Sequence, residues 1–228
     1  MDGIGAIYAE GRTRLTGLVS AADPEGRTAP VPGCPRWAVR DVMAHVTGVC
    51  ADVLAGKIEG VATEPWTARQ VAERQDKPLA EILDEWAGVA PQVEAIAEHF
   101  PARTDEQWVL DLTTHEHDIR GALGAPGGRE ARGVLVGLDF AVTMGLAASL
   151  SARQLPAVRV RASDRDWIAG DGEPAATVQG SAFELFRALT GRRSADQVRG
   201  LDWDGDLEVF LPAFEFGPFT FPANDLVE

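Results

Sequence analysis

The hydrophobic pattern of this chain changes its period near residue 154, and this change constrains the fold more than any other feature. Before it, apolar residues recur every three or four positions, which is typical of amphipathic helices. After it, short segments such as 158–162 alternate apolar and polar residues, as half-buried strands do. We therefore expect a helical bundle at residues 1–153 and a small α+β domain at 154–228.

The first part predicts an up-and-down helical bundle. Its expected helices cover residues 3–22, 37–56, 67–75, 78–99, 105–123 and 130–152. Pro91 implies a kink or break in the fourth of these helices. Thr104 and Gln107 have the spacing of a capping box at the start of the fifth.

The second part contains short strand candidates at 158–162, 167–168, 176–178 and 207–210. A capping-box pattern that begins at Ser181 predicts one helix among them. The acidic segment 202–206 lacks the distal glutamate of a calcium loop, so we interpret it as a solvated turn. The fold class is thus α followed by α+β.

Charge and cysteine content exclude several classes of protein. The net charge is −14, from 35 acidic and 21 basic residues, which argues against nucleic acid or an anionic membrane as partner. Cys34 and Cys50 form no CxxC pair, so we expect reduced thiols and no disulfide framework. The N-terminus lacks the features of a signal peptide, and the longest apolar run, 134–150, is interrupted by polar residues. We expect a cytoplasmic protein that does not span a membrane.

Residues 108–124 place ionisable side chains at helical spacing. His115 follows Asp111 by four positions and Asp118 follows His115 by three, so all three project from nearly the same face. A carboxylate and an imidazole one turn apart can reach the same divalent ion. Such pairs are also common on solvated helix faces, so the spacing alone leaves both interpretations open.

His45 lies among apolar positions on the inward side of its expected helix. It is either a core histidine bonded to a carbonyl or a third ligand that converges with Asp111 and His115. Two imidazoles and one carboxylate leave an open coordination position, which is typical of catalytic rather than structural zinc. His117 is rotated from His115 by about 200° on a helix, so we expect no ligand there, and we expect Glu116 to be solvated.

Two motifs resemble the mycothiol-dependent maleylpyruvate isomerase family, which belongs to the DinB-like four-helix-bundle superfamily. They are Val31-Pro-Gly-Cys-Pro-Arg-Trp37 with Arg40-Asp-Val-Met-Ala-His45, and Asp111-x-x-x-His115-x-x-Asp118-Ile-Arg-x-Ala-Leu-Gly124. Segments 181–193 and 201–206 are similar to the small sterol-carrier-like C-terminal domain that often follows the bundle. Where the family has a glutamate ligand, this chain has Asp111, which is one methylene shorter.

The resemblance implies that His45, Asp111 and His115 bind a divalent metal, usually zinc, and that mycothiol, a small actinobacterial thiol, is the cosubstrate. It implies an enzyme in which a metal-bound thiolate, not a protein nucleophile, attacks a small electrophilic substrate. An isomerase releases the thiol again, whereas an S-transferase leaves it on the product. We expect a monomer or homodimer. The alternatives are a non-catalytic metal- or ligand-binding bundle, and a lipid-like carrier built on the C-terminal phenylalanines.

Several further residues have two open interpretations. Asp118 either accepts the second N–H of His115, which would fix the ligating nitrogen, or is a surface carboxylate. Arg192 and Arg193 either hold a carboxylate substrate or lie on the surface. Trp37 either anchors the core, which we favour, or forms a platform for the substrate.

Overall fold

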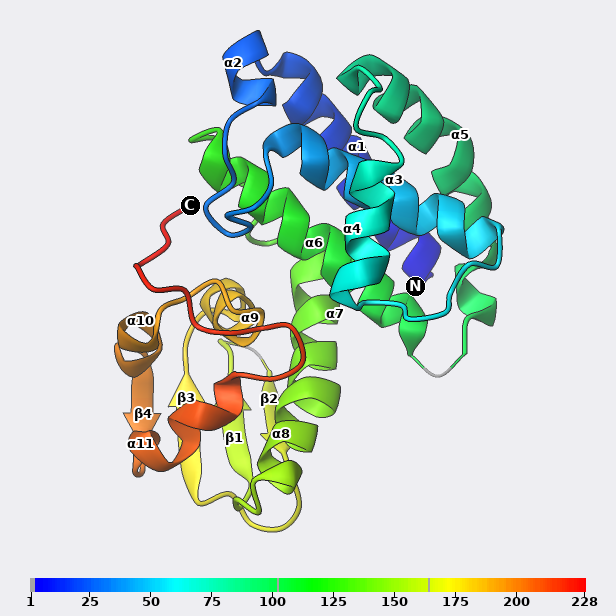
Figure 1. The fold of residues 1–228 in the computed structure, drawn as a ribbon. Helices are drawn as coiled ribbons and strands as arrows, with labels where there is room; N and C mark the ends of the chain where they lie inside the picture. The colour runs from blue at the N-terminus through cyan, green and yellow to red at the C-terminus, as the bar shows by residue number, and fades with distance from the viewer. Residues whose placement is uncertain (1–2, 102, 164) are drawn as a thin grey trace. The chain divides into compact units, whose positions relative to one another are not determined.

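A computed structural model describes residues 3–101, 103–163 and 165–228 of the chain. These residues group into two compact units, Met1–Gly127 with Glu228, and Gly128–Val227 (Figure 1). The units divide at Gly127, earlier than the change of hydrophobic period, because the expected helix at 130–152 packs with the strands that follow it. The domain boundary near 154 stays a prediction.

The first unit confirms the expected helical bundle. Its elements are α1 Ile4–Ala21, α2 Pro24–Arg27, α3 Val39–Leu54, α4 Glu64–Ala72, α5 Leu79–Ile96, the 3₁₀ turn η1 Ala97–His99, and α6 Thr104–Ala122. Helix α3 packs against α4, α5 and α6, while α1 packs against α5 and α6. The four long helices α1, α3, α5 and α6 therefore enclose one core, and the shorter α4 packs against α3.

Helices α3 and α6 are buried on nearly every side. All residues from 42 to 50 of α3 are buried, as are residues 108–110 and 112–119 of α6. A helix enclosed all round lies in the interior of its unit. Polar side chains on these two helices therefore face other protein groups rather than bulk water, and each needs a partner.

Pro91 lies inside α5 without ending it, so the helix does not break there, and the alternative of a kink stays a prediction. The capping box predicted at Thr104 is wrong, because Thr104 is already the first helical residue and its hydroxyl donates to the Pro101 carbonyl at 2.6 Å. The N-cap is Arg103, in the left-handed region at φ 64°.

The second unit combines one long helix with a four-stranded sheet (Figure 1). The helix runs through α7 Arg132–Phe140, the π-helical η2 Ala141–Leu146 and α8 Ala147–Ala152. The strands are β1 Val158–Arg161, β2 Asp166–Ala169, β3 Ala176–Gln179 and β4 Asp202–Asp204, in the order β2-β1-β3-β4. Only the β1–β3 pair is parallel. The remaining elements are α9 Ala182–Leu189, α10 Ala195–Arg199, α11 Leu207–Phe210 and η3 Leu211–Phe214.

The segment Arg132–Ala152 is long and apolar enough to cross a membrane, with a mean hydropathy of 1.8 over its most apolar window. Half of that window is buried within the protein. The segment contacts α9 and β2 of its own unit. Packing against these elements therefore covers half of the apolar window.

Two predictions for the second unit are wrong. Residues 207–210 form helix α11 rather than a strand, since alternation over only four residues also fits a single helical turn. Phe210 is buried while Val209 is 44% exposed. In the expected solvated turn at 202–206, the first three residues instead form β4, which pairs antiparallel with β3 around Trp203. The segment is nevertheless exposed, as expected, at every residue except Trp203.

Candidate metal centre

The structure brings His45, Asp111 and His115 together in the first unit. His45 projects from α3 and the other two from α6, which packs against α3. Oδ1 of Asp111 lies 3.3 Å from Nε2 of His45 and 3.6 Å from Nε2 of His115. One ligand atom from each residue lies within 4.8 Å of the other two. These separations suit three ligands of one divalent ion at about 2.0–2.2 Å from each.

Each imidazole uses its other ring nitrogen for a protein contact. Nδ1 of His45 lies 2.8 Å from Oε1 of Gln70, and Nδ1 of His115 lies 3.2 Å from Oδ2 of Asp118. Metal-binding histidines characteristically donate this second N–H to a carbonyl or carboxylate. Both Nε2 atoms are then left with their lone pairs directed toward Asp111. The donor chemistry therefore fits a divalent ion.

Burial gives the cluster a single more exposed member. His45 and His115 are 2% and 6% exposed, whereas the Asp111 side chain is 32% exposed. The indole of Trp37 lies over both imidazoles, with ring centroids 5.1 Å from His45 and 5.9 Å from His115. Trp37 is half-buried and lies beside the cluster. This position is intermediate between the two interpretations of the sequence, a core anchor and a platform for the substrate.

A second group of possible ligands shares His115. Sγ of Cys34 lies 3.3 Å from Oδ2 of Asp118 and 3.8 Å from Nδ1 of His115. The turn at 31–37 holds Cys34 there through backbone hydrogen bonds, among them Val31 N to the Trp37 carbonyl at 2.9 Å. The Cys34 thiol and the His115 imidazole both donate to Asp118, so ordinary hydrogen bonds account for this group. The 2% exposed Asp118 is not a surface carboxylate.

Sequence reasoning did not identify Cys34 or Gln70 as part of the cluster. Cys34 lies in the Val31–Trp37 segment of the motif that also contains His45. This shared motif was a sequence signal that Cys34 lies near the cluster. Gln70 lies on the short helix α4, and only the packing of α4 against α3 brings it to His45. A lone glutamine on an ordinary helix carries no such signal in the sequence.

Two other polar residues of α6, Glu116 and His117, lie outside the cluster. Glu116 is fully buried rather than solvated, and it forms ion pairs with Arg14 at 2.8 Å and Arg120 at 3.0 Å. His117 is also buried and belongs to neither group of possible ligands. The helical register that placed His117 away from the centre is consistent with this.

Arg192 and Arg193 lie in the second unit and are 9% and 5% exposed, so they are not surface residues. Arg193 pairs with Glu184 at 2.7 Å, and Arg192 donates to the Thr190 carbonyl at 2.7 Å. These contacts are internal to the unit. The substrate-binding role expected of the two arginines stays a prediction.

Cys50 is buried in an aromatic cluster of the bundle. Its Sγ lies 3.3 Å from the Tyr8 hydroxyl, and the Tyr8 ring stacks on Trp108 with centroids 3.5 Å apart. Burial raises the pKa of the Cys50 thiol to about 11. Burial likewise raises the pKa of Tyr8 above its usual value.

This raised pKa predicts that the protein loses stability in alkaline solution. From about pH 8.5 the unfolded chain releases the Cys50 proton while the folded protein retains it, so the free energy of unfolding falls by about 3 kcal/mol as pH rises to about 11. Urea unfolding at a series of pH values measures the slope. Cys50→Ser should flatten it below pH 10; an unchanged slope in that variant would contradict the assignment to Cys50.

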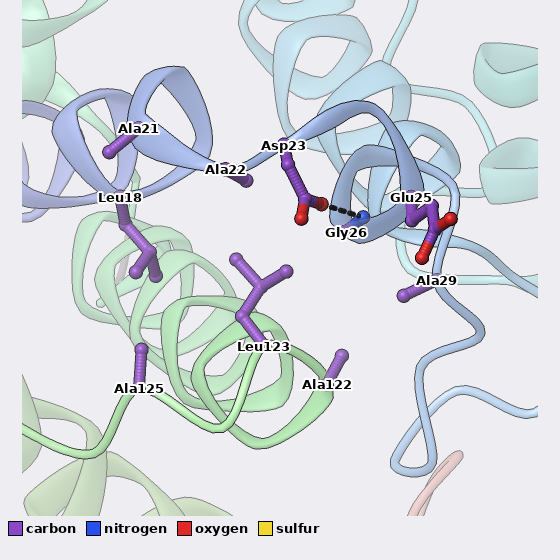
Figure 2. A pocket seen from close by; sticks show the side chains of 10 residues that line it. All are labelled: Leu18, Ala21, Ala22, Asp23, Glu25, Gly26, Ala29, Ala122, Leu123 and Ala125. Atoms are coloured by element: carbon purple, nitrogen blue, oxygen red, sulfur yellow. Dashed lines mark hydrogen bonds between the residues drawn. The ribbon is translucent and has the colours of Figure 1, made fainter.

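A separate cavity of about 500 Å³ lies where the ends of α1, α2 and α6 meet (Figure 2). Its lining is mostly alanine and leucine, with Asp23 and Glu25 as the charged side chains. Asp23 accepts a hydrogen bond from the Gly26 amide at 2.7 Å, which caps α2. The cavity therefore lacks the converging polar groups of a catalytic site.

The fold and the histidine cluster together define a helical-bundle protein with a candidate metal centre of two histidines and one carboxylate. The family model described as the mycothiol maleylpyruvate isomerase N-terminal domain matches residues 8–124, more than half of the chain. The chain belongs to this family. The match contains all three residues of the centre.

The chain is also similar in fold to solved structures. Crystal structures of the mycothiol-dependent maleylpyruvate isomerase and of a histidine-to-alanine mutant of it each align with a TM-score of 0.60. They cover 88% of this chain and 91% of theirs, at 11% and 10% sequence identity. No curated protein sequence matches the chain. At this identity the similarity shows the fold alone, and its 88% coverage includes residues of both units.

Proposed function

We propose that this protein is a metal-dependent thiol enzyme that uses mycothiol and acts on a small electrophilic substrate, as an isomerase or an S-transferase. The observation that carries the proposal is the convergence of two imidazole Nε2 atoms on the Asp111 carboxylate, with both Nδ1 atoms engaged by protein oxygens. Family membership favours mycothiol and isomerisation. We propose zinc as the metal because two imidazoles and one carboxylate are typical of catalytic zinc sites.

His45, Asp111 and His115 would hold the ion. When bound, it would supply the positive charge that lowers the pKa of a coordinating thiol, so that the thiol is nucleophilic at neutral pH. Asp111 contributes the single negative charge among these three ligands. Asp118 holds the His115 ring by accepting from its Nδ1, and the indole of Trp37 covers one side of both rings.

Asp111 is proposed to bind the ion directly. Its side chain is shorter than the glutamate expected from the family, yet Oδ1 lies within 3.6 Å of both imidazole nitrogens. The backbone of α6 therefore lies close enough to α3 for the shorter carboxylate to reach. Asp111→Asn should weaken metal binding while His45 and His115 stay in place; unchanged binding in a chelator competition would argue that Asp111 is not a ligand.

The reaction is tested with zinc-loaded protein, mycothiol and maleylpyruvate, the substrate named for the structural neighbours. Isomerisation returns the thiol unchanged, whereas transfer consumes one thiol for each product, so thiol consumption separates the two reactions. We expect turnover that requires both the metal and the thiol. Absence of turnover with maleylpyruvate and with a panel of other electrophiles would instead favour a binding protein.

A further inference from the structure

A chain of buried side chains leads from His45 away from the candidate metal centre. Oε1 of Gln70 lies 2.8 Å from Nδ1 of His45, and Nε2 of Gln70 donates to Oδ2 of Asp52 at 2.8 Å. Arg69 donates to the same Asp52 oxygen at 2.9 Å. Gln70 is fully buried and Asp52 is 3% exposed, while the Arg69 side chain is 41% exposed. This series of hydrogen-bonded side chains therefore begins in the core and ends at the surface.

The direction of each hydrogen bond follows from its acceptor. An ionised carboxylate can only accept, so Asp52 must face the NH₂ group of the Gln70 amide. The amide oxygen is then directed to His45, and its Nδ1 must be the donor. A neutral His45 that donates from Nδ1 carries its lone pair on Nε2, the nitrogen that faces Asp111 at 3.3 Å.

Close packing of α4 on α3 holds Gln70 in this position. A Cβ atom on Gly48 would lie 2.5 Å from Cβ of Gln70 and 3.0 Å from the guanidinium of Arg74. Only glycine at this position of α3 allows α4 to approach so closely. Arg74 also donates to the Gln70 carbonyl at 3.1 Å. The amide is thus fixed by packing as well as by its hydrogen bonds.

We infer that Gln70 is a positioning residue of the metal centre. Gln70 holds His45 in the tautomer that binds the ion through Nε2, and it separates the charge of Asp52 from His45 by one side chain. This inference rests on the proposed function, because it concerns the same ion. The two histidines then differ: His115 donates directly to the carboxylate of Asp118, and His45 donates to a neutral amide. An amide behind His45 leaves more positive charge at the centre for an anionic thiolate.

The first test replaces Gln70 with leucine, which has a similar volume and no acceptor. Gln70→Leu should weaken zinc affinity by about 10–100-fold, the usual effect of losing such an outer partner. Competition with a chromophoric chelator measures the dissociation constant. Gln92→Leu is the matched control, because Gln92 is exposed on α5 and donates only to its own helix at the Gly88 carbonyl; its zinc affinity should equal that of the wild type.

The second test exchanges the amide and the carboxylate. In Gln70→Glu with Asp52→Asn, the new amide at position 52 donates to the new carboxylate at position 70, so the hydrogen bond to His45 is kept and the charge moves next to it. The Arg69 hydrogen bond is lost, because Arg69 donates to the same atom of residue 52 as Gln70 does. A more basic imidazole should make zinc affinity at least as tight as in the wild type, and mycothiol should bind the cobalt-loaded variant more weakly. A role in packing alone would restore zinc affinity without changing thiol affinity.

The outcomes separate the inference from the proposed function. If the wild type binds no zinc, the proposed metal centre is wrong. If the wild type binds zinc and Gln70→Leu binds it equally well, the inference about Gln70 is wrong while the metal centre stands. An exchange variant that binds zinc as weakly as Gln70→Leu, or thiol as tightly as the wild type, would also overturn the inference. Urea unfolding of each metal-free variant confirms that the fold is retained.

Discussion

Replacing His115 with alanine is expected to leave the purified protein without a stoichiometric divalent ion. The substitution removes an imidazole that lies within 3.6 Å of Asp111 and is held by Asp118, and the remaining His45 and Asp111 offer one nitrogen and one carboxylate. Two ligands are fewer than zinc sites in proteins normally use. Plasma mass spectrometry of the desalted protein measures the metal content, and His45→Ala should give the same loss.

His99→Ala provides the control for this experiment, because His99 is exposed at the end of η1 and belongs to neither group of possible ligands. This variant should retain the metal content of the wild type. Retention of a full equivalent of metal by both His115→Ala and His45→Ala would show that the ion binds elsewhere. A wild type without any divalent ion would contradict the assignment outright.

Replacing Glu116 with alanine is expected to destabilise the bundle more than any surface substitution. The carboxylate is fully buried, and it is bonded by Arg14 from α1 and by Arg120 from its own helix. The side chains of Arg14 and Arg120 are 29% and 13% exposed. Removing the carboxylate leaves their two guanidinium groups beside each other without the anion that both contact. Breaking a buried ion pair typically costs a few kcal/mol, so we expect a loss of about 3 kcal/mol in the free energy of unfolding.

Urea unfolding monitored by circular dichroism measures this loss. Glu64→Ala is the matched control, since Glu64 pairs with Arg36 at 2.9 Å but both side chains are more than half exposed. Exposed pairs contribute about 0–1 kcal/mol, so the control should unfold almost as the wild type does. Equal stabilities of the two variants would mean that the buried Arg14–Glu116 pair does not stabilise the packing of α1 against α6.

The helical half of the fold was predictable because its signal is long. Apolar periodicity over some twenty residues located α1 and α3, and it placed His45 on an inward face. Helix α5 was located from the prolines at 78 and 101, and α6 from the expected caps near residues 104 and 124. The second unit was less predictable, because its strands and α11 contain only three or four residues each. Alternation over three or four residues fits both a strand and one turn of helix, so the pattern at 207–210 predicts a strand where the structure has α11.

The candidate centre was predictable only as far as sequence spacing extends. The spacing of Asp111 and His115 on one helix is local, and the family resemblance supplied His45 as their partner. The contacts of Gln70 with His45 and of Arg14 with Glu116 depend on how helices approach one another in space. Hydrophobic periodicity does not encode such contacts. The prediction that Glu116 is solvated is therefore wrong, since Glu116 is fully buried.

The most direct test of the account is a titration of the cobalt-loaded protein with mycothiol, followed by absorption spectroscopy. If His45, Asp111 and His115 hold an ion with an open position, the thiol will coordinate it as a thiolate. A sulfur-to-cobalt charge-transfer band should then appear and saturate at one thiol per ion, and His115→Ala should show no band. A cobalt spectrum that mycothiol leaves unchanged would contradict the central claim that this centre binds the thiol cosubstrate.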